Sequence, residues 1–376
     1  MSRIAVLSYD YPPNDGGISR LASALVVELS QRNFDVNVVS IAADGRAGLV
    51  RPHVPTREVP RSRLRRDLAT FQYLWDYPKD ASILATVWNP EATLAWLTGK
   101  TNITVMAHGN EVMPYSRRGA PMFKRRLRRR ILAAAQTVVC NSRYTEQLVL
   151  ELSPDANTVV IRPAVDAVRF SADHDKISVC RRLGLPKDKL IVLSVSRLDA
   201  YKGHDTVLHA LAKLDSSLRA KLHYAVAGQG GHLQELQNLA VELELADCIS
   251  WLRFVSEDEL PGLYACADLF VLCTREDSVA RGVEGFGMVF LEAQASGLPV
   301  LGTRAGGIPD AIVEGQGGWL VPQDDLDAVA EHLAQLAQNP EPYRQQGALG
   351  RERVCREASW ARYADQLLDA MKVEHV

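Results

Sequence analysis

The chain has 376 residues, more than a single hydrophobic core of ordinary size accommodates, so two domains are expected. Hydrophobic residues make up 47% of the sequence and charged residues 23%, a balance typical of soluble globular proteins. No stretch approaches the roughly 20 continuous apolar residues of a transmembrane helix, which argues against a membrane-spanning chain.

The formal net charge of -2 conceals an uneven distribution along the chain. Residues 1–162 contain 22 basic and 14 acidic residues, whereas the remainder contains 21 basic and 31 acidic residues. A basic first half and an acidic second half indicate two domains with different partners.

Cysteine usage and the N-terminal residues bear on the compartment. The six cysteines are scattered, with no CxxC pair and no histidine-rich partner segment, so neither a disulfide framework nor a zinc site is expected. The apolar run Ile4–Ser8 is followed at once by Tyr9-Asp10-Tyr11-Pro12-Pro13, which predicts a strand and a turn rather than a secretion signal. A reducing, cytoplasmic location fits best.

Short β-branched runs alternate with amphipathic helices, a pattern typical of parallel α/β layers. In the first half, a helix is expected from Ser19 to about Arg32, with Ser19 as its N-cap. The periodicity breaks at residues 162–166, which predicts the end of a first domain near residue 165. Strands of this half are expected at Ile4–Ser8, Val36–Ser40, Ile83–Val87, Ile103–Ala107, Thr137–Cys140 and Val159–Ile161.

The alternation restarts in the second half, which predicts a second domain of residues 175–358. Its helices are expected at Asp205–Leu214, Ser256–Ala265, Glu284–Ser296 and Asp324–Gln338, and a last amphipathic helix at Ser359 to about Lys372. Its strands are expected at Leu190–Val195, His223–Ala227, Cys248–Trp251, Leu269–Leu272, Val300–Thr303 and Gly318–Val321.

Two candidate binding segments follow strands of the first half. Pro12-Pro13-Asn14-Asp15-Gly16-Gly17 lies between the first strand and a helix, where glycines allow a ligand close to the backbone. A plain turn is the alternative. His108 and Glu111 follow another strand, at the carboxyl end where ligands of open α/β sheets bind. A lone histidine is more often structural, but this position favours a binding role.

A third segment, Val195-Ser196-Arg197-Leu198-Asp199-Ala200-Tyr201-Lys202-Gly203-His204-Asp205, places two cations in one loop after a strand. Fixed cations stabilise a diphosphate leaving group more as its bond breaks than in the ground state. The alternative is solvated basic residues with Asp205 as a helix cap. The later turn Val226-Ala227-Gly228-Gln229-Gly230-Gly231 is not a dinucleotide fingerprint, because residue 233 is leucine.

The most informative stretch, Val283–Ala293, reads V-E-G-F-G-M-V-F-L-E-A and continues through Gly297-Leu298-Pro299-Val300 to Gly306-Gly307-Ile308-Pro309-Asp310. Glu284 and Glu292 stand eight positions apart, about 2.2 turns of helix. Gly285 and Gly287 leave N–H groups accessible where a helix would begin, which suits an anionic, hydroxyl-rich ligand. The alternative is an ordinary buried βαβ unit.

This block resembles the E-x7-E signature of the family 4 retaining glycosyltransferases, enzymes of the GT-B fold, and other matches extend along nearly the whole chain. The resemblance implies an α/β protein of two Rossmann-like, doubly wound domains that face an interdomain cleft. Residues 1–165 with the C-terminal helix 359–376 would bind the acceptor, and residues 175–358 would bind a nucleotide-diphosphate sugar. It implies no metal ion and no cofactor.

The family pattern also implies roles for single residues. Arg197 and Lys202 would neutralise the diphosphate, Glu284 would hold the far edge of the sugar, and His108 would contact the transferred sugar. Glu111 matches a position that aligns the acceptor. The donor would be bound by Gly16, Gly17, Gly228, Arg253, Val255, Gly285, Phe286, Gly287, Met288, Val289 and Glu292. Relatives often carry glycine at the position of Arg253, which leaves the base open.

The donor and the reaction leave alternatives. The loop Thr274–Gly282 is similar to that of some mannosyltransferases, which favours GDP-mannose over UDP-glucose or UDP-N-acetylglucosamine. A sugar-nucleotide epimerase of the same fold would need no acceptor, and a silent nucleotide-binding subunit would turn nothing over. The acceptor would be a saccharide or a lipid-linked saccharide.

Three charged segments remain, one basic and two acidic. A basic helix over residues 117–132, with Arg117, Arg118, Lys124, Arg125, Arg128 and Arg129, is expected to contact the acceptor or an anionic membrane surface, although a solvated face is the alternative. Nucleic acid is not expected, since no aromatic platform accompanies the charge. The D-x-D triplets Asp173–Asp175 and Asp325–Asp327 lie in a linker and at a helix start, so neither predicts a metal site.

Overall fold

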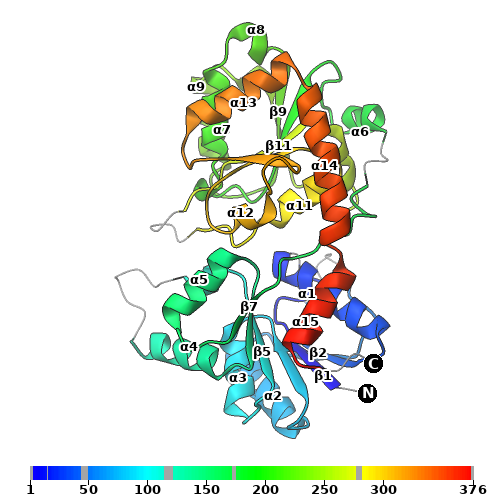
Figure 1. Ribbon diagram of the computed structural model, residues 1–376, viewed down its shortest axis with the longest axis vertical. Helices are drawn as coiled ribbons and strands as arrows, with labels where there is room; N and C mark the ends of the chain where they lie inside the picture. The colour runs from blue at the N-terminus through cyan, green and yellow to red at the C-terminus, as the bar shows by residue number, and fades with distance from the viewer. Residues whose placement is uncertain are drawn as a thin grey trace. The chain divides into compact units, whose positions relative to one another are not determined.

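The computed structural model describes residues 3–14, 16–43, 50–113, 122–171, 175–276 and 282–373. The chain divides into two compact units, one of Met1–Pro163 with Trp360–Val376 and one of Ala164–Ser359 (Figure 1). Helix α15 (Trp360–Ala370) therefore belongs to the first unit, where it packs against α1 (Gly17–Gln31). No helix in the described ranges is long and apolar enough to cross a bilayer.

The first unit is built on a parallel sheet. In its described residues, seven strands lie in the order β3-β2-β1-β4-β5-β6-β7. The predicted apolar strands are confirmed within two residues. The edge strand β3 was not predicted, because its sequence T-R-E-V is mostly polar. The strands are β1 (Arg3–Leu7), β2 (Asp35–Ile41), β3 (Thr56–Val59), β4 (Ser82–Ala85), β5 (Ile103–Ala107), β6 (Thr137–Cys140) and β7 (Thr158–Val160).

Helices cover both faces of this sheet (Figure 1). Helix α1 links β1 to β2 in one direction along the sheet, and the later crossovers run in the other. Because such crossovers are right-handed, α1 lies on one face and α2 to α5 lie on the other. Neighbouring helices α2 and α3, and α3 and α4, pack together. Their bounds are α2 (Arg63–Asp76), α3 (Thr93–Leu97), α4 (Met122–Ala134) and α5 (Arg143–Leu152).

The prediction that Ser19 caps α1 is wrong. The helix begins at Gly17 with Gly16 as its N-cap, and no side chain caps it. Ser19 is buried inside the first turn, where its Oγ donates to the carbonyl of Asn14 at 2.7 Å. The helix thus begins two residues before the predicted start, and Gly16 occupies the N-cap position although it has no side chain.

The second unit repeats the architecture. Its described strands lie in the order β10-β9-β8-β11-β12-β13, all parallel, and the apolar strand predictions are again confirmed within two residues. They are β8 (Leu190–Val195), β9 (Leu222–Ala227), β10 (Ile249–Arg253), β11 (Leu269–Leu272), β12 (Val300–Thr303) and β13 (Gly318–Val321). Apolar clusters pack on the sheet.

The helices of the second unit are α6 (Lys176–Arg182), α7 (His204–Ala212), α8 (Ser216–Arg219), α9 (Leu233–Glu242), α10 (Leu260–Cys266), α11 (Met288–Ala295), α12 (Ile308–Ala311), α13 (Leu326–Gln338) and α14 (Glu341–Glu357). The predicted helix Glu284–Ser296 is thus too long by its first turn. Gly287 takes a left-handed conformation, φ 95°, so helical geometry starts only after it.

Each sheet has one switch point, where the strand order reverses between β1 and β4, and between β8 and β11. Loops that leave the carboxyl ends of two such strands run to opposite faces, so the sheet edge opens between them. Ligands of doubly wound folds bind in this crevice. The two switch points therefore mark where each unit would hold a ligand.

Candidate functional site

The loop after β8 carries a buried ion pair at the switch point of the second unit. Lys202 Nζ donates to Glu284 Oε2 at 2.6 Å, and 11% of the lysine side chain and 18% of the glutamate side chain are exposed. Burial alone would lower the pKa of Lys202, but the charge and hydrogen bond of Glu284 outweigh it, so the pKa is raised. The ammonium is therefore a permanent positive charge.

Gly203 fixes this loop against the loop after β11. Its φ is 72°, and an added Cβ would lie 1.8 Å from the carbonyl oxygen of Cys273. The N–H of Arg275 donates to the Tyr201 carbonyl at 2.8 Å, and the Arg275 guanidinium binds the Asp205 carboxylate at 2.7 and 2.8 Å. The expected alternative role of Asp205, a helix cap, is thus replaced by an ion pair between the two loops.

His204 joins the same loop to the interior. Its ring lies 2.9 Å from Ser196 Oγ and 3.0 Å from Tyr224 Oη, which in turn meets Ser194 Oγ at 2.8 Å. Burial, together with the smaller effect of the nearby Lys202 charge, lowers the pKa of His204 to about 3. The imidazole is neutral, so it serves to position the loop.

Arg197 is the exposed cation of this edge. Its side chain is 70% exposed, 3.2 Å from the Asp199 carboxylate and 3.2 Å from Tyr201 Oη. The loop therefore holds two positive groups, the exposed guanidinium of Arg197 and the buried ammonium of Lys202. Such a pair suits a diphosphate, whose charge is spread over several oxygens.

The two glutamates of the E-x7-E block do not lie on one helix. Glu284 precedes α11, and its carbonyl accepts the N–H of Gly307 at 2.8 Å, while an added Cβ on Gly306 would come within 2.3 Å of the same oxygen. The predicted separation of about 2.2 helical turns is therefore wrong. Instead, the loop of Gly306 and Gly307 holds Glu284 where Lys202 can meet it.

Glu292 lies inside α11 and is buried. Tyr264 Oη donates to Glu292 Oε2 at 2.8 Å. Sequence reasoning missed Tyr264, because a tyrosine in an apolar helix resembles any core residue. The contact orients the carboxylate, and the expected ribose contact stays a prediction.

The ends of β9 and β10 supply the remaining predicted donor residues. Gly228 has φ 146°, and an added Cβ would lie 1.8 Å from the Ser196 carbonyl oxygen. Its N–H donates at 2.6 Å to the carbonyl of Arg253, which takes a left-handed φ of 55° at a bulge. The left-handed conformation explains why glycine would suit position 253. Phe254, which the sequence reasoning passed over, is exposed there.

Phe286 is the predicted donor residue that fits least well. Its side chain is buried in the apolar core of the second unit, so only its backbone could meet a ligand. Val255, Met288 and Val289 are half-buried against the same core. Gly285 and Gly287 lie in the loop just before α11, near Glu284.

In the first unit, the predicted residues lie after β1 and β5. Gly16 and Gly17 begin α1, and His108 follows β5, as expected. The His108 ring Nε2 lies 2.8 Å from the carbonyl oxygen of Thr86, and the backbone N–H of His108 donates to Glu111 Oε1 at 2.6 Å. Glu111 therefore stabilises its own loop. To align the acceptor substrate as predicted, its carboxylate would have to bind that substrate as well as the backbone of His108.

A buried carboxylate, Glu91, was missed at the switch point of this unit. It follows β4, and its Oε1 accepts the N–H of Tyr9, which follows β1, at 3.2 Å. Its Oε2 has no hydrogen-bond partner in the described residues. Burial raises the pKa of Glu91 to about 7. A single Glu in W-N-P-E-A gives no sequence signal for this environment.

The basic helix is α4, and Arg117 and Arg118 fall outside the described residues. Lys124, Arg125 and Arg129 are exposed. Arg128 is buried, donating to the carbonyls of Glu111 at 3.2 Å and Met113 at 3.0 Å. The prediction that Arg128 contacts a membrane or acceptor is therefore wrong, because it faces inward and fixes the Glu111 loop.

The acidic triplets have structural roles where they are described. Asp325 caps α13 by accepting the N–H of Ala328 at 3.0 Å, as predicted, and Asp327 pairs with Lys213. Asp173 lies outside the described residues, while Asp175 caps α6. Within the described ranges, no three His, Cys, Asp or Glu side chains gather as metal ligands would.

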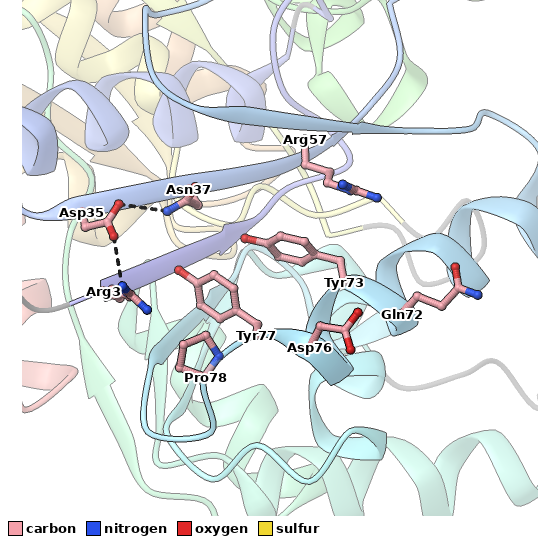
Figure 2. Close-up of a pocket in the computed structure, with 9 residues that line it drawn as sticks. All are labelled: Arg3, Asp35, Asn37, Arg57, Gln72, Tyr73, Asp76, Tyr77 and Pro78. Carbon is pink, nitrogen blue, oxygen red and sulfur yellow. Dashed lines mark hydrogen bonds and ion pairs between the residues drawn. The ribbon is translucent and has the colours of Figure 1, made fainter.

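A pocket of about 630 Å³ lies elsewhere on the first unit (Figure 2). It is lined at the amino-terminal edge of the sheet by Arg3, Asp35 and Asn37, and the hydroxyls of Tyr73 and Tyr77 point toward these strands. No predicted site residue lines it. It also lies at the edge opposite to the one where doubly wound sheets bind ligands.

Similarity to known proteins decides the family. A family model for glycosyl transferases group 1 matches residues 176–353, and one for glycosyltransferase family 4 matches residues 15–169. A GDP-mannose-dependent alpha-(1-6)-phosphatidylinositol monomannoside mannosyltransferase of Mycolicibacterium smegmatis is 31% identical over 371 residues, 92% of each chain. The chain belongs to glycosyltransferase family 4.

Solved structures agree with this glycosyltransferase family in fold. Sucrose-phosphate synthase from Thermosynechococcus elongatus superposes with a TM-score of 0.81 at 22% identity, covering 99% of this chain and 98% of the other. The Anabaena protein HepE, in complex with UDP and glucose, has a TM-score of 0.81 at 17% identity, covering 99% and 100%. The expected GT-B class, with two Rossmann-like α/β domains, is confirmed.

Proposed function

We propose that this glycosyltransferase moves a mannosyl unit from GDP-mannose to a lipid-linked or saccharide acceptor, with retention of anomeric configuration. The paired Lys202 and Glu284, at the β8–β11 switch point beside Arg197, carry the proposal. The similarity to a GDP-mannose-dependent enzyme over 92% of the chain supports the donor. UDP-sugars are the remaining donors to test.

The second unit would bind the donor. The Lys202 ammonium has three N–H groups and donates one to Glu284, so others are available to the diphosphate. Arg197 would bind the same group from the solvent side, the amides near Gly287 would meet sugar hydroxyls, and Glu292 would accept from the ribose. As the glycosidic bond breaks, the diphosphate gains charge, and the two cations would stabilise it more than the ground state.

Retention would follow from reaction on one face of the sugar. The bond between the anomeric carbon and the leaving phosphate oxygen breaks, and the acceptor oxygen bonds to that carbon on the same side. The departing phosphate oxygen takes the acceptor proton. Neither a covalent enzyme intermediate nor a metal ion or cofactor is needed in this scheme, and catalysis would rest on positioning and electrostatics.

The first unit, with α15, would bind the acceptor through Gly17, His108 and Glu111. A lipid-linked acceptor is supported by the relative, whose name includes a phosphatidylinositol monomannoside as substrate. Such an acceptor stays in its bilayer, so the enzyme would meet it on the cytoplasmic membrane face. The exposed Lys124, Arg125 and Arg129 of α4 would attract anionic lipid.

Thermal shift with nucleotide diphosphates tests the donor site, because ligand binding to the folded state raises the melting temperature. GDP should raise it, and UDP should do so less. Failure of both GDP and UDP would remove the donor-site assignment. Incubation with GDP-mannose alone, followed by NMR, checks for an isomerised nucleotide sugar, which would instead indicate an epimerase.

A further inference from the structure

The pocket of Figure 2, called here the β1–β3 edge pocket, takes no part in the proposed transfer reaction. Three neighbouring strands form its floor. Asp35 and Asn37 are two positions apart on β2, so they share a face of the sheet, and Arg3 is the register partner of Asp35. Arg57 of β3 lies on the same face, because it pairs with Val39, two positions beyond Asn37. Four polar residues therefore lie where an apolar core would otherwise continue.

The carboxyl end of helix α2 forms the wall opposite these strands (Figure 2). The rings of Tyr73 and Tyr77 lie 5.1 Å apart with a tilt of 34°, and both rest half-buried against the core of the first unit. The buried Lys100 ammonium donates to the backbone carbonyls of Tyr77 and Pro78, which fixes the chain just after the helix. The aromatic wall is therefore formed before any ligand arrives, as is usual for small-molecule sites.

Polar groups of the β1–β3 edge pocket have unused hydrogen-bonding capacity. The side chains of Gln72 and Asp76 are exposed and make no hydrogen bond or ion pair with the described part of the chain. Tyr77 Oη is buried and has no hydrogen-bond partner among the described residues either. A buried hydroxyl without a partner costs free energy. A small ligand that carries hydroxyl groups, held between α2 and the strands, would relieve this cost.

The charges of the lining favour a neutral ligand. Two arginines and two aspartates line the pocket, and Arg3 Nε already lies 3.3 Å from Asp35 Oδ2. Arg57, whose guanidinium lies 5.9 Å from the centre of the Tyr73 ring, and Asp76 add one charge of each sign. A phosphate group would find a single cation without an ion pair and would also face a carboxylate. The pocket therefore suits an uncharged polar molecule better than an anion.

We propose that the β1–β3 edge pocket is a further, non-catalytic binding site for a neutral saccharide. Sugar hydroxyls both donate and accept, so carboxylate, amide and guanidinium groups can all bind them. The C–H groups of a sugar ring carry slight positive charge and pack on the negative faces of tyrosine rings. The volume of about 630 Å³ lies within the range of small-molecule sites, about 300 to 1,000 Å³. The inference does not depend on the donor or the acceptor of the proposed function.

Saturation-transfer difference NMR of the full chain with mannotriose and with maltotriose, two neutral saccharides, tests the site. The wild type should bind at least one of them, and saturating GDP should not displace it. Gln72→Ala combined with Asp76→Ala should weaken binding at least about tenfold, because it removes hydrogen bonds to the ligand. Glu242→Ala combined with Gln338→Ala, at exposed positions that end α9 and α13, is the matched control and should bind as the wild type does.

The outcomes separate this site from the proposed function. Wild-type affinity in the Gln72→Ala, Asp76→Ala variant, or displacement of the saccharide by GDP, would overturn the proposal. So would the absence of binding of either trisaccharide at about 10 mM, which exceeds the dissociation constant of a weak ligand. If the double variant does not fold by its melting curve, Gln72→Ala alone replaces it under the same criterion. A thermal shift by GDP without saccharide binding removes only the pocket assignment, and saccharide binding without a shift by GDP or UDP removes only the donor assignment.

Discussion

The two units share a fold, yet their switch points differ in charge. At the β8–β11 edge, Lys202 is paired with Glu284, and Arg197 stands exposed beside them. At the β1–β4 edge, Glu91 is buried, its Oε1 accepts the N–H of Tyr9, and no cation lies at hydrogen-bond distance from it in the described residues. The β8–β11 edge therefore suits an anionic ligand. The β1–β4 edge disfavours negative charge, because ionisation of the buried Glu91 is unfavourable there.

The largest expected effect comes from the close contact that joins the two loops of the second unit. Gly203→Ala should lower stability by at least about 3 kcal/mol and abolish transfer, because the new Cβ would meet the Cys273 carbonyl. Gly99→Ala is the control, since Gly99 has a similar φ of 76° but open space around it. It should lose only about 1 kcal/mol.

Urea unfolding and initial transfer rates measure both variants. Equal losses for Gly203→Ala and Gly99→Ala would show that backbone conformation alone matters. The contact between the loops would then have no special role.

Glu91→Gln should sharpen the contrast between the units through pH. The folded-state pKa of Glu91 is about 7 against an ordinary 4.5, so ionisation opposes folding as pH rises from about 4.5 to 7. The variant should gain on the wild type by up to about 3 kcal/mol above pH 7 and by nothing below pH 4. Urea unfolding across this range measures it, and a pH-independent difference would contradict the buried carboxylate.

Lys202→Ala should lower kcat/KM at least tenfold, about 1.4 kcal/mol of transition-state stabilisation. Arg197→Ala should act in the same direction. Lys213→Ala, which removes a surface cation of the same unit paired with Asp327, is the control and should leave the rate unchanged. Near-normal rates for both site variants would remove the cations from the mechanism.

Tyr264→Phe should have the smallest effect. It removes the hydrogen bond to Glu292, about 1 kcal/mol, so the dissociation constant of the donor should rise several-fold while kcat changes little. Glu292→Ala should weaken donor affinity more. Calorimetric titration with GDP measures both, and an unchanged affinity for Glu292→Ala would remove it from the donor site.

Sequence reasoning found most of the architecture because buried parallel strands read as apolar runs. Ile103–Ala107 and Leu190–Val195 were placed to the residue. The polar edge strand β3 gave no such signal, and the start of α11 was misplaced because a left-handed glycine cannot be recognised from apolar spacing. The motifs therefore predicted where the loops lie in the sequence, but not the backbone conformation of those loops.

The sequence predicted which residues form the candidate site, but not which of them contact one another. Arg197, Lys202 and Glu284 were named from their motifs, but the 2.6 Å pair joins residues 82 positions apart, which no local pattern reveals. The prediction that Arg128 contacts the acceptor or a membrane was wrong because a basic run suggests that every side chain is exposed. In a helix on a sheet, about one side chain in every turn faces the core. Glu91 lay outside every motif.

The most direct test is the structure of the chain with bound GDP. The account predicts diphosphate oxygens within about 3 Å of Lys202 Nζ and of the Arg197 guanidinium, at the carboxyl ends of β8 and β11. A diphosphate bound elsewhere, out of reach of both side chains, would contradict it.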